Sequence, residues 1–244
     1  MNFTFGIITN SQTSHFIESI IHSIIKQNIP NYEIIIVGTI TLPEYIDENV
    51  TIISFDETIY PAWITKKKNI IIDHAKYENI VFLHDYIIFE DGWYDGFLKF
   101  GNNFDVVSNI IHNMNGDRFR DWNINSGFKE GFILNNGIRP NPIVGALDEW
   151  IKDHSQHIPI DIDISSYMTP CGLLDYDADT EKLQKYIYLS GTYWVAKKCV
   201  MIDCRLNESL LHCQGEDVEW CQRVREKYKY SFNPWSKVSL LKHR

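Results

Sequence analysis

The sequence predicts a single α/β domain, with a mostly parallel β-sheet and helices on both of its faces. Strand-like and helix-like segments alternate through the first hundred residues, an order typical of parallel sheets with crossover helices. The strand-like segments are apolar without interruption, as expected of strands that are buried on both faces. The chain has 244 residues, 44% of them hydrophobic, which is enough for one large core.

The elements of the first half are short apolar strands and amphipathic helices, separated by turn residues. In chain order we expect strand 3–8, helix 14–28, strand 33–37, strand 50–54, helix 64–76 and strand 80–83. In such a sheet, ligands bind at the carboxyl ends of the strands. The residues that follow each strand are therefore the first candidates for a site.

The second half has a looser pattern. A long segment over residues 112–180 is rich in Asn, Gly, Asp and Pro, and a loop of this length inside a compact domain is usually functional. We therefore expect a lid or a substrate platform there. Around it, the periodicity predicts strand 105–108, strand 186–196, helix 216–228 and strand 238–241.

Charge and composition narrow the class of protein. The formal net charge is −9, which argues against a nucleic-acid-binding protein, because phosphate neutralisation needs a broad basic face. No apolar run reaches the roughly 18 residues of a transmembrane helix, and the N-terminus has no signal-peptide pattern. Five cysteines, an odd number, suit a reducing compartment. We expect a cytoplasmic protein, and peripheral attachment to a membrane stays open.

The first candidate for chemistry is segment 81–89, VFLHDYIIF, in which a buried strand ends at His84 and Asp85. A carboxylate inside a sheet needs a partner. Mg²⁺ or Mn²⁺ is one such partner, because these ions bind one or two carboxylates together with the oxygens of a diphosphate. The alternative is a solvated aspartate in a loop, and this segment alone does not decide between the two.

The second candidate is segment 215–228, GEDVEWCQRVREKY, which places Glu216 and Asp217 in the first turn of a helix. The helix dipole favours carboxylates there, and this explains them without any function. The alternative is that one carboxylate takes the proton of an acceptor hydroxyl as that hydroxyl attacks a sugar carbon.

The third candidate is segment 66–69, KKKN, a basic cluster in an acidic protein. It lies near the start of the helix that leads into the Asp85 strand. Such clusters usually form a solvated face, but lysines in this position can also neutralise a diphosphate as point charges. Thr9 and Asn10, directly after the first strand, would line a nucleotide pocket, or serve as ordinary turn residues.

Together these segments resemble the inverting glycosyltransferases of the GT-A fold, in particular those of the family-2 type. That family has a Thr-Asn pair after the first strand, a basic residue and Asn before a DxD metal motif, a Gly-aromatic segment, and an ED motif that opens a helix. The matching residues are Ile8-Thr9-Asn10, Lys68-Asn69, His84-Asp85-Tyr86, Ser190-Gly191-Thr192-Tyr193 and Gly215-Glu216-Asp217-Val218-Glu219-Trp220. The resemblance covers nearly the whole chain. It departs from the family at the DxD motif, where the HDY variant lacks the second acid.

The resemblance implies a Rossmann-like GT-A domain spanning residues 1–244. Residues 1–110 would form its nucleotide-sugar-binding half, and residues 111–244 its acceptor and catalytic half. The implied reaction moves a sugar from a nucleoside-diphosphate donor to a hydroxyl of a glycan or another acceptor, with inversion. UDP is the favoured nucleotide, and Mn²⁺ or Mg²⁺ is the implied cofactor.

The resemblance also implies catalytic roles. Asp217 is expected to be the general base, with Glu216 as the second choice. Asp85 would bind the metal. His243, near the C-terminus, would be a further metal ligand or a plain terminal residue.

The same resemblance implies contacts with the substrates. Trp122 is expected to pack against the acceptor and Tyr193 against the acceptor or the donor sugar, although core packing is the more common role of such rings. The residues expected to contact the nucleotide sugar are Thr9, Asn10, Lys67, Lys68, Asn69, His84, Asp85 and Tyr193.

Two other classes of protein remain open. A nucleotidyltransferase shares the α/β layout, the metal and the phosphate-binding lysine, but it normally has a Gly-rich loop after the first strand, and residues 7–12, IITNSQ, contain no glycine. A non-catalytic carbohydrate-binding protein of the same fold would explain the incomplete DxD motif. Binding of nucleoside diphosphates with and without Mn²⁺ separates these classes from the enzyme.

Overall fold

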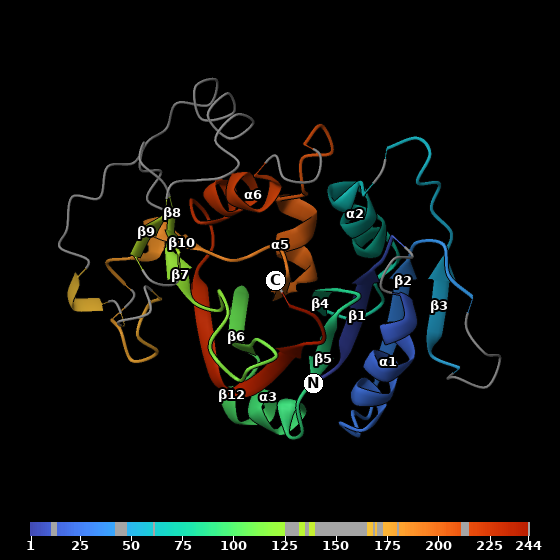
Figure 1. Cartoon of the computed structure of the whole chain (residues 1–244), viewed down its shortest axis with the longest axis horizontal. Helices are drawn as coiled ribbons and strands as arrows, with labels where there is room; N and C mark the ends of the chain where they lie inside the picture. The colour runs from blue at the N-terminus through green and yellow to red at the C-terminus, as the bar shows by residue number, and fades with distance from the viewer. Residues whose placement is uncertain are drawn as a thin grey trace.

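The computed structural model describes residues 1–10, 14–41, 48–60, 62–124, 132–134, 137–139, 165–167, 169, 173–179, 181–210 and 215–243. Within these residues, eight strands form one sheet, and helices lie on both of its faces (Figure 1). No helix in this part of the chain is long and apolar enough to cross a membrane.

The strands of the sheet are β1 (Phe3–Ile8), β2 (Tyr32–Val37), β3 (Val50–Ile53), β4 (Asn79–His84), β5 (Ile87–Phe89), β6 (Val106–His112), β11 (Tyr193–Lys197) and β12 (Tyr230–Leu240). They lie in the order β3-β2-β1-β4-β11-β6-β12-β5. The first four in this order are parallel, as are β6 and β12, whereas β11 is antiparallel to both of its neighbours and β5 to β12. The prediction of a mostly parallel sheet is confirmed.

The helices divide between the two faces of the sheet. α1 (Ile17–Ile25) and α3 (Trp93–Phe100) pack into one core, while α2 (Ile64–His74), α5 (Lys198–Asp203) and α6 (Glu216–Val224) pack into the other. Successive side chains of a strand point to opposite faces. β11 therefore sends Tyr193 into the first core and Trp194 into the second.

Shorter elements lie outside the main sheet. They are η1 (Ser14–Phe16), β7 (Asn123–Ile124), β8 (Phe132–Leu134), β9 (Gly137–Arg139), η2 (Ser165–Tyr167), η3 (Gln184–Tyr186) and β10 (Ile187–Tyr188). β7 pairs with β10 in antiparallel fashion, with Asn123 opposite Tyr188. Most of the predicted loop over residues 112–180 lies outside the described residues.

Two strand predictions differ from the structure. The expected strand 186–196 is two strands, β10 and β11, because the chain turns between them at Ser190–Thr192. β12 starts at Tyr230, well before the expected residue 238, and a bulge between Asn233 and Lys237 interrupts its pairing with β6. The bulge removes the regular alternation on which a strand prediction depends.

Two helices, α3 and α5, were not predicted. α5 has six residues, too few to show a helical period. α3 contains Gly96, a poor helix former. The structure explains the glycine, because a Cβ there would lie 2.5 Å from the carbonyl oxygen of Trp235. Close packing against β12 therefore overrides the local preference.

Candidate active site

Two buried side chains meet where β1 and β4 end. These strands are parallel, with Ile8 opposite His84, so Thr9 and Asp85 leave the sheet side by side. The Thr9 hydroxyl donates a hydrogen bond of 2.5 Å to Oδ2 of Asp85, and the two residues are 3% and 4% exposed. The buried carboxylate thus has the partner that burial requires.

Lys67 adds a positive charge to the same strand ends. Its Nζ donates a hydrogen bond of 2.6 Å to the carbonyl oxygen of Thr9 and pairs with the carboxylate of Glu57. Burial lowers the pKa of Lys67, and the charges of Glu57 and Asp85 oppose that shift. We refer to Thr9, Glu57, Lys67 and Asp85 as the β1–β4 cluster.

A second set of contacts surrounds Asp217 at the start of α6. Its Oδ2 accepts hydrogen bonds from the Tyr188 hydroxyl at 2.6 Å and from the Gly191 amide at 2.8 Å. Its Oδ1 accepts one from the Val218 amide at 2.9 Å. Burial and the charge of Asp217 raise the pKa of Tyr188 well above its usual value, so Tyr188 acts as a hydrogen-bond donor. Glu216, the residue before Asp217, is 8% exposed.

Gly191 fits this position because it has no side chain. A Cβ there would lie 3.0 Å from Oδ2 and 3.3 Å from the Cβ of Asp217, which is too close for a larger residue to fit without a shift. The carbonyl oxygen of Gly191 accepts a hydrogen bond of 2.8 Å from Lys68. We refer to Lys68, Tyr188, Gly191, Glu216 and Asp217 as the α6 cluster.

Lys68 is enclosed by the protein. The residue is 1% exposed, and its Nζ lies 3.9 Å from the centre of the Trp194 ring, which stacks on Trp220. Burial lowers the pKa of Lys68 to about 8, although the charges of Glu216 and Asp217 act in the opposite direction. The ammonium group is therefore charged at neutral pH and loses its proton at moderately alkaline pH.

This lowered pKa predicts how stability depends on pH. The ordinary lysine pKa is 10.5, so between about pH 8 and this value the unfolded chain binds more protons at Lys68 than the folded chain. Stability therefore rises with pH in this window through Lys68. Relative to a Lys68→Met variant, the wild-type protein should gain on the order of 2 kcal/mol from about pH 7.5 to about pH 10. Urea unfolding of both proteins measures this gain, and a difference that stays constant with pH would contradict the prediction.

The two clusters are joined through the sheet. β11 is antiparallel to β4, and the His84 amide donates a hydrogen bond of 3.2 Å to the carbonyl oxygen of Thr192, so the turn that contains Gly191 lies against the end of β4. α2 reaches both clusters, with Lys67 on one and Lys68 on the other. The predicted site residues that the structure brings together are Thr9, Lys67, Lys68, His84, Asp85, Glu216 and Asp217.

The two aromatic residues that were expected to contact the substrates, Tyr193 and Trp122, lie in the two cores instead. The Tyr193 hydroxyl donates a hydrogen bond of 2.5 Å to Asn109 and accepts one from Trp93. Trp122 is 1% exposed, and its ring centre lies 5.4 Å from that of Phe232. Core packing accounts for both rings, and we propose no sugar contact for either.

Asn69 and Asn10 lie at the margins of these clusters. The amide group of Asn69 donates hydrogen bonds of 2.9 Å to the Leu206 carbonyl and to the Glu208 carboxylate, which ties α2 to the segment after α5. Asn10 is exposed directly after the end of β1. Its predicted contact with a nucleotide stays a prediction.

The two predicted metal ligands, Asp85 and His243, belong to segments that lie side by side. The Leu241 amide donates a hydrogen bond of 2.8 Å to the carbonyl oxygen of Tyr86, and His243 is exposed two residues further on. No three His, Cys, Asp or Glu side chains are grouped to hold a metal among the residues that the structure describes. A single buried carboxylate fits Mn²⁺ or Mg²⁺ bound jointly with a diphosphate, because such ions complete their coordination with phosphate oxygens and water.

Two residues of these clusters were not predicted. Tyr188 reaches Asp217 because the chain turns after β10, and the sequence predicted one continuous strand there. Glu57 lies in a segment without regular structure, and nothing in its sequence context marks it as a partner of Lys67. The structure supplies the signal that the sequence lacks, because Lys67 is buried and a buried ammonium group requires a nearby acceptor.

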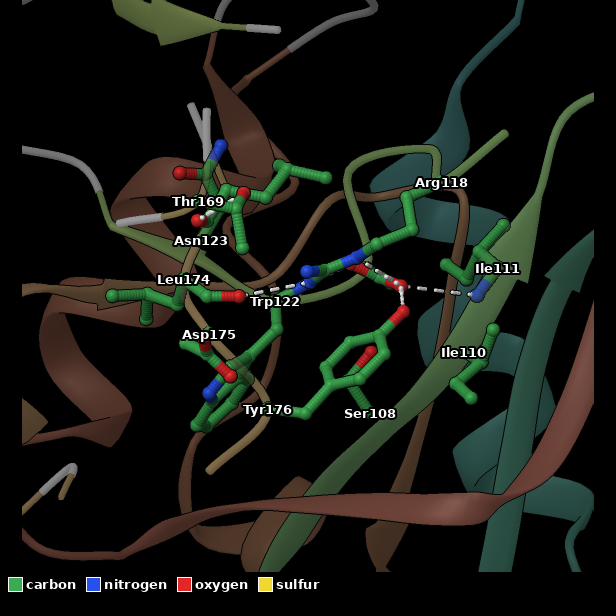
Figure 2. Close-up of polar contacts among 12 residues, drawn as sticks. Ser108, Ile110, Ile111, Arg118, Trp122, Asn123, Thr169, Leu174, Asp175 and Tyr176 are labelled. Carbon is green, nitrogen blue, oxygen red and sulfur yellow. Dashed lines mark hydrogen bonds and ion pairs between the residues drawn. The ribbon is translucent and has the colours of Figure 1, made fainter. Parts of the chain in front are cut away.

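An ion pair between buried Asp121 and partly buried Arg118 lies next to β7. Arg118 donates hydrogen bonds to the carboxylate of Asp121, the shortest at 2.8 Å, and one of 3.0 Å to the Leu174 carbonyl oxygen. The Tyr176 hydroxyl donates a further bond of 2.6 Å to Asp121. Figure 2 shows Arg118 approaching Leu174 and Tyr176, which lie two residues apart on another segment of the chain. Because β7 pairs with β10, this network supports the strand that carries Tyr188.

Comparisons with known proteins show the fold. No protein-family model matches the sequence, and no curated protein matches it. Among solved structures, S. aureus TarS residues 1–349 has 14% identity and a TM-score of 0.56, over 97% of this chain and 60% of TarS 1–349. The same fragment in complex with UDP has 13% identity and a TM-score of 0.54, over 98% and 61% of the two chains. GalNAc-T7 with UDP, GalNAc and Mn²⁺ has 11% identity and a TM-score of 0.58, over 98% and 43%.

These neighbours are GT-A glycosyltransferases, and the chain has the same GT-A fold. The fold class that the sequence predicts is thereby confirmed. The chain spans about 60% of the length of TarS 1–349 and less than half of GalNAc-T7. At identities of 11% to 14% the likeness concerns the fold, and function has to be argued from the site.

Proposed function

We propose that this protein is a glycosyltransferase, which moves a sugar from a nucleoside-diphosphate donor to an acceptor hydroxyl with inversion. One observation carries the proposal: in a GT-A fold, Asp85 and Asp217 lie where β4 ends and β11 begins, and each is held by its own hydrogen-bond donors. UDP is the favoured nucleotide, because the TarS and GalNAc-T7 structures include complexes with UDP. The acceptor would be a glycan or another hydroxyl compound.

The β1–β4 cluster is the proposed donor site. Thr9 and Asn10 would line the nucleotide pocket at the end of β1, and His84 and Asp85 would lie beside the diphosphate. Lys67 contributes a positive charge next to Asp85, where charge develops on the departing diphosphate. A divalent metal held by Asp85 would supply further positive charge there, and we propose Mn²⁺ or Mg²⁺ because the GalNAc-T7 structure contains Mn²⁺.

Asp217 is the proposed general base. As the acceptor oxygen attacks the anomeric carbon, Asp217 takes the proton of the hydroxyl. The bond from that carbon to the diphosphate breaks, and the diphosphate leaves with the electron pair. Attack from the face opposite the leaving group inverts the carbon. Tyr188 and Gly191 both donate to Oδ2, which fixes the direction of the carboxylate, and Glu216 is the second candidate for the base.

A donor-hydrolysis screen tests this proposal, because slow transfer to water requires no knowledge of the acceptor. The protein is incubated with UDP-, GDP- and dTDP-sugars, with and without Mn²⁺. We expect release of UDP and free sugar from a UDP-sugar, with stimulation by Mn²⁺. Formation of a nucleotide sugar and pyrophosphate from a nucleoside triphosphate would indicate a nucleotidyltransferase instead. Glycan binding without turnover of any donor would indicate a carbohydrate-binding protein.

Replacement of Asp85 with asparagine tests the donor site. We expect UDP affinity in the presence of Mn²⁺ to fall at least about tenfold, because a neutral amide attracts a divalent cation far less than a carboxylate does. Affinity measured without Mn²⁺ should change little. Isothermal titration of UDP measures both values.

Asp91→Asn is the matched control, since Asp91 is an exposed carboxylate paired with Lys26. A His243→Ala variant in the same titration tests whether His243 is a further ligand. Equal losses of UDP affinity with and without Mn²⁺ in Asp85→Asn would rule out a metal role for Asp85.

A further inference from the structure

Three consecutive lysines on α2 have different surroundings, because successive residues of a helix point about 100° apart. Lys66 is partly exposed and pairs with Glu208. Lys67 reaches the carbonyl oxygen of Thr9 in the β1–β4 cluster. Lys68 reaches the carbonyl oxygen of Gly191 in the α6 cluster. The same chemical group is thus placed in a partly exposed ion pair, at the proposed donor site and beside the proposed base.

The surroundings of Lys68 do not suit contact with a diphosphate. Its ammonium group donates to the Gly191 carbonyl oxygen at 2.8 Å and lies 3.9 Å from the centre of the Trp194 ring. Trp194 stacks on Trp220 at a centroid distance of 5.1 Å, and both tryptophans belong to the buried core on this face. A phosphate would have to enter that core to reach Nζ, at a large desolvation cost.

The Gly191 peptide connects Lys68 to Asp217. Its carbonyl oxygen accepts from Lys68, and its amide donates to Oδ2 of Asp217 at 2.8 Å. A contact at each side restrains the turn that contains this peptide. The turn also contains Thr192, whose carbonyl oxygen accepts from the His84 amide at the end of β4. A shift of Gly191 would therefore move the hydrogen bond that orients the carboxylate.

We propose that Lys68 is a positioning residue for Asp217, acting through the Gly191 peptide, and that it does not bind the donor diphosphate. The proposal rests on the proposed function, in which Asp217 is the base. Lys68 fixes the turn through its hydrogen bond to the Gly191 carbonyl oxygen, and the Gly191 amide orients the Asp217 carboxylate. That carboxylate then accepts the proton of the acceptor hydroxyl. The burial of Lys68 and the nearby charges of Glu216 and Asp217 agree with this role, because a buried ammonium group needs acceptors and opposite charge.

The experiment compares Lys68→Met, Lys67→Met and Lys66→Met. Methionine keeps much of the length of the lysine side chain and removes its charge and its donors. Lys66→Met is the control, because Lys66 lies on the same helix and pairs with Glu208 outside both clusters. For each variant we measure kcat and KM for hydrolysis of a UDP-sugar, the Kd for UDP with Mn²⁺, and hydrogen–deuterium exchange of peptides covering residues 188–193.

For Lys68→Met we expect kcat to fall at least about tenfold, because small displacements of a catalytic group strongly reduce the rate. The KM and the Kd for UDP should stay within about twofold of the wild-type values, and exchange at residues 188–193 should become faster. Lys66→Met should match the wild-type protein. Lys67→Met should instead raise the Kd for UDP. If Lys68→Met raises the Kd for UDP and leaves exchange at 188–193 unchanged, Lys68 is a phosphate ligand and the proposal is wrong.

A Gly191→Ala variant tests the connection without altering Lys68. The added Cβ would lie 3.0 Å from Oδ2 of Asp217, so the carboxylate or the turn has to move. We expect the same fall in kcat with an unchanged Kd for UDP. Full activity of Gly191→Ala would contradict the proposal, even if Lys68→Met did not fold.

The same measurements distinguish a failure of the glycosyltransferase proposal from a failure of the positioning role of Lys68. If the wild-type protein hydrolyses no nucleotide sugar, the glycosyltransferase assignment fails, while the exchange measurement still decides whether Lys68 holds the turn. If the wild-type protein is active and Lys68→Met behaves like Lys66→Met in every measurement, the positioning role alone is wrong.

Discussion

An Asp217→Asn variant should transfer sugar about 10³-fold more slowly than the wild-type protein, yet bind UDP within about twofold of the wild-type affinity. The amide cannot accept a proton from the acceptor hydroxyl at neutral pH. The proposed donor contacts lie in the β1–β4 cluster, which the substitution does not touch. The expected loss is therefore confined to kcat.

The hydrogen bonds that Asp217 accepts determine how the Asp217→Asn substitution changes stability. The Tyr188 hydroxyl and the Gly191 amide both donate to Oδ2, and the Val218 amide donates to Oδ1. An asparagine satisfies the first two by placing its oxygen at the Oδ2 position, but its NH₂ group then faces the Val218 amide. One hydrogen bond is lost at a partly exposed site, so a stability change of only about 1 kcal/mol is expected.

Kinetics of UDP-sugar hydrolysis and titration of UDP measure the two quantities. Glu226→Gln is the control, since Glu226 is an exposed carboxylate just beyond α6. Glu216→Gln, measured in parallel, distinguishes the two candidate bases, because only the base should show the large fall in kcat. Equal losses of kcat and UDP affinity in Asp217→Asn would reject the base assignment.

The β1–β4 cluster follows from the sequence because parallel strands align their carboxyl ends. The apolar runs that end at Ile8 and Leu83 predicted two strands, and residues after neighbouring strands of one sheet must lie close together. Thr9 and Asp85 do so, and they share a hydrogen bond. The partner of Lys67 did not follow, because Glu57 lies in a segment whose path depends on tertiary contacts.

The α6 cluster follows from the sequence only in part. The helix start at Glu216 and Asp217 was predictable from periodicity and from the two carboxylates in the first turn. The contact with Tyr188 was not, because it depends on a turn that interrupts an apparently continuous strand. Neither was the burial of Lys68, since consecutive lysines read as a solvated face until the neighbours of the helix are known.

The burial of the two aromatic residues, Tyr193 and Trp122, was also not predicted. Tyr193 is the first residue of β11, and the two-residue alternation of a strand decides the face of the sheet to which its side chain points. Trp122 lies just before β7 and packs into the core on the face that carries α2, α5 and α6. Tyr193 points into the core on the face that carries α1 and α3, away from Lys68 and Asp217. Proximity in sequence to a motif therefore predicts neither exposure nor contact with a ligand.

An Asp121→Asn variant should lower the free energy of unfolding by about 3 kcal/mol, because it removes a fully buried carboxylate and leaves the partly buried charge of Arg118 uncompensated. The side chain of Asp121 is 0% exposed and that of Arg118 is 17% exposed. Asp121 also accepts hydrogen bonds from the Tyr176 hydroxyl and from the Trp122 amide. An asparagine accepts at one atom only, so at least one of these donors loses its acceptor. Urea unfolding gives the change, with Asp117→Asn as a control at an exposed carboxylate.

A double-mutant cycle with Arg118→Met separates the ion pair from the rest of the network. We expect the double variant to be more stable than the sum of the single effects predicts, by at least about 1 kcal/mol, because both substitutions remove the same interaction. The network also constrains Arg120, whose φ of 46° is uncommon for a residue other than glycine and persists only where its neighbours fix the backbone. Loosening Asp121 should therefore also speed hydrogen exchange in β7 and in its partner β10, which carries Tyr188. An additive cycle, or an Asp121→Asn variant as stable as Asp117→Asn, would show that the ion pair does not hold this part of the site in place.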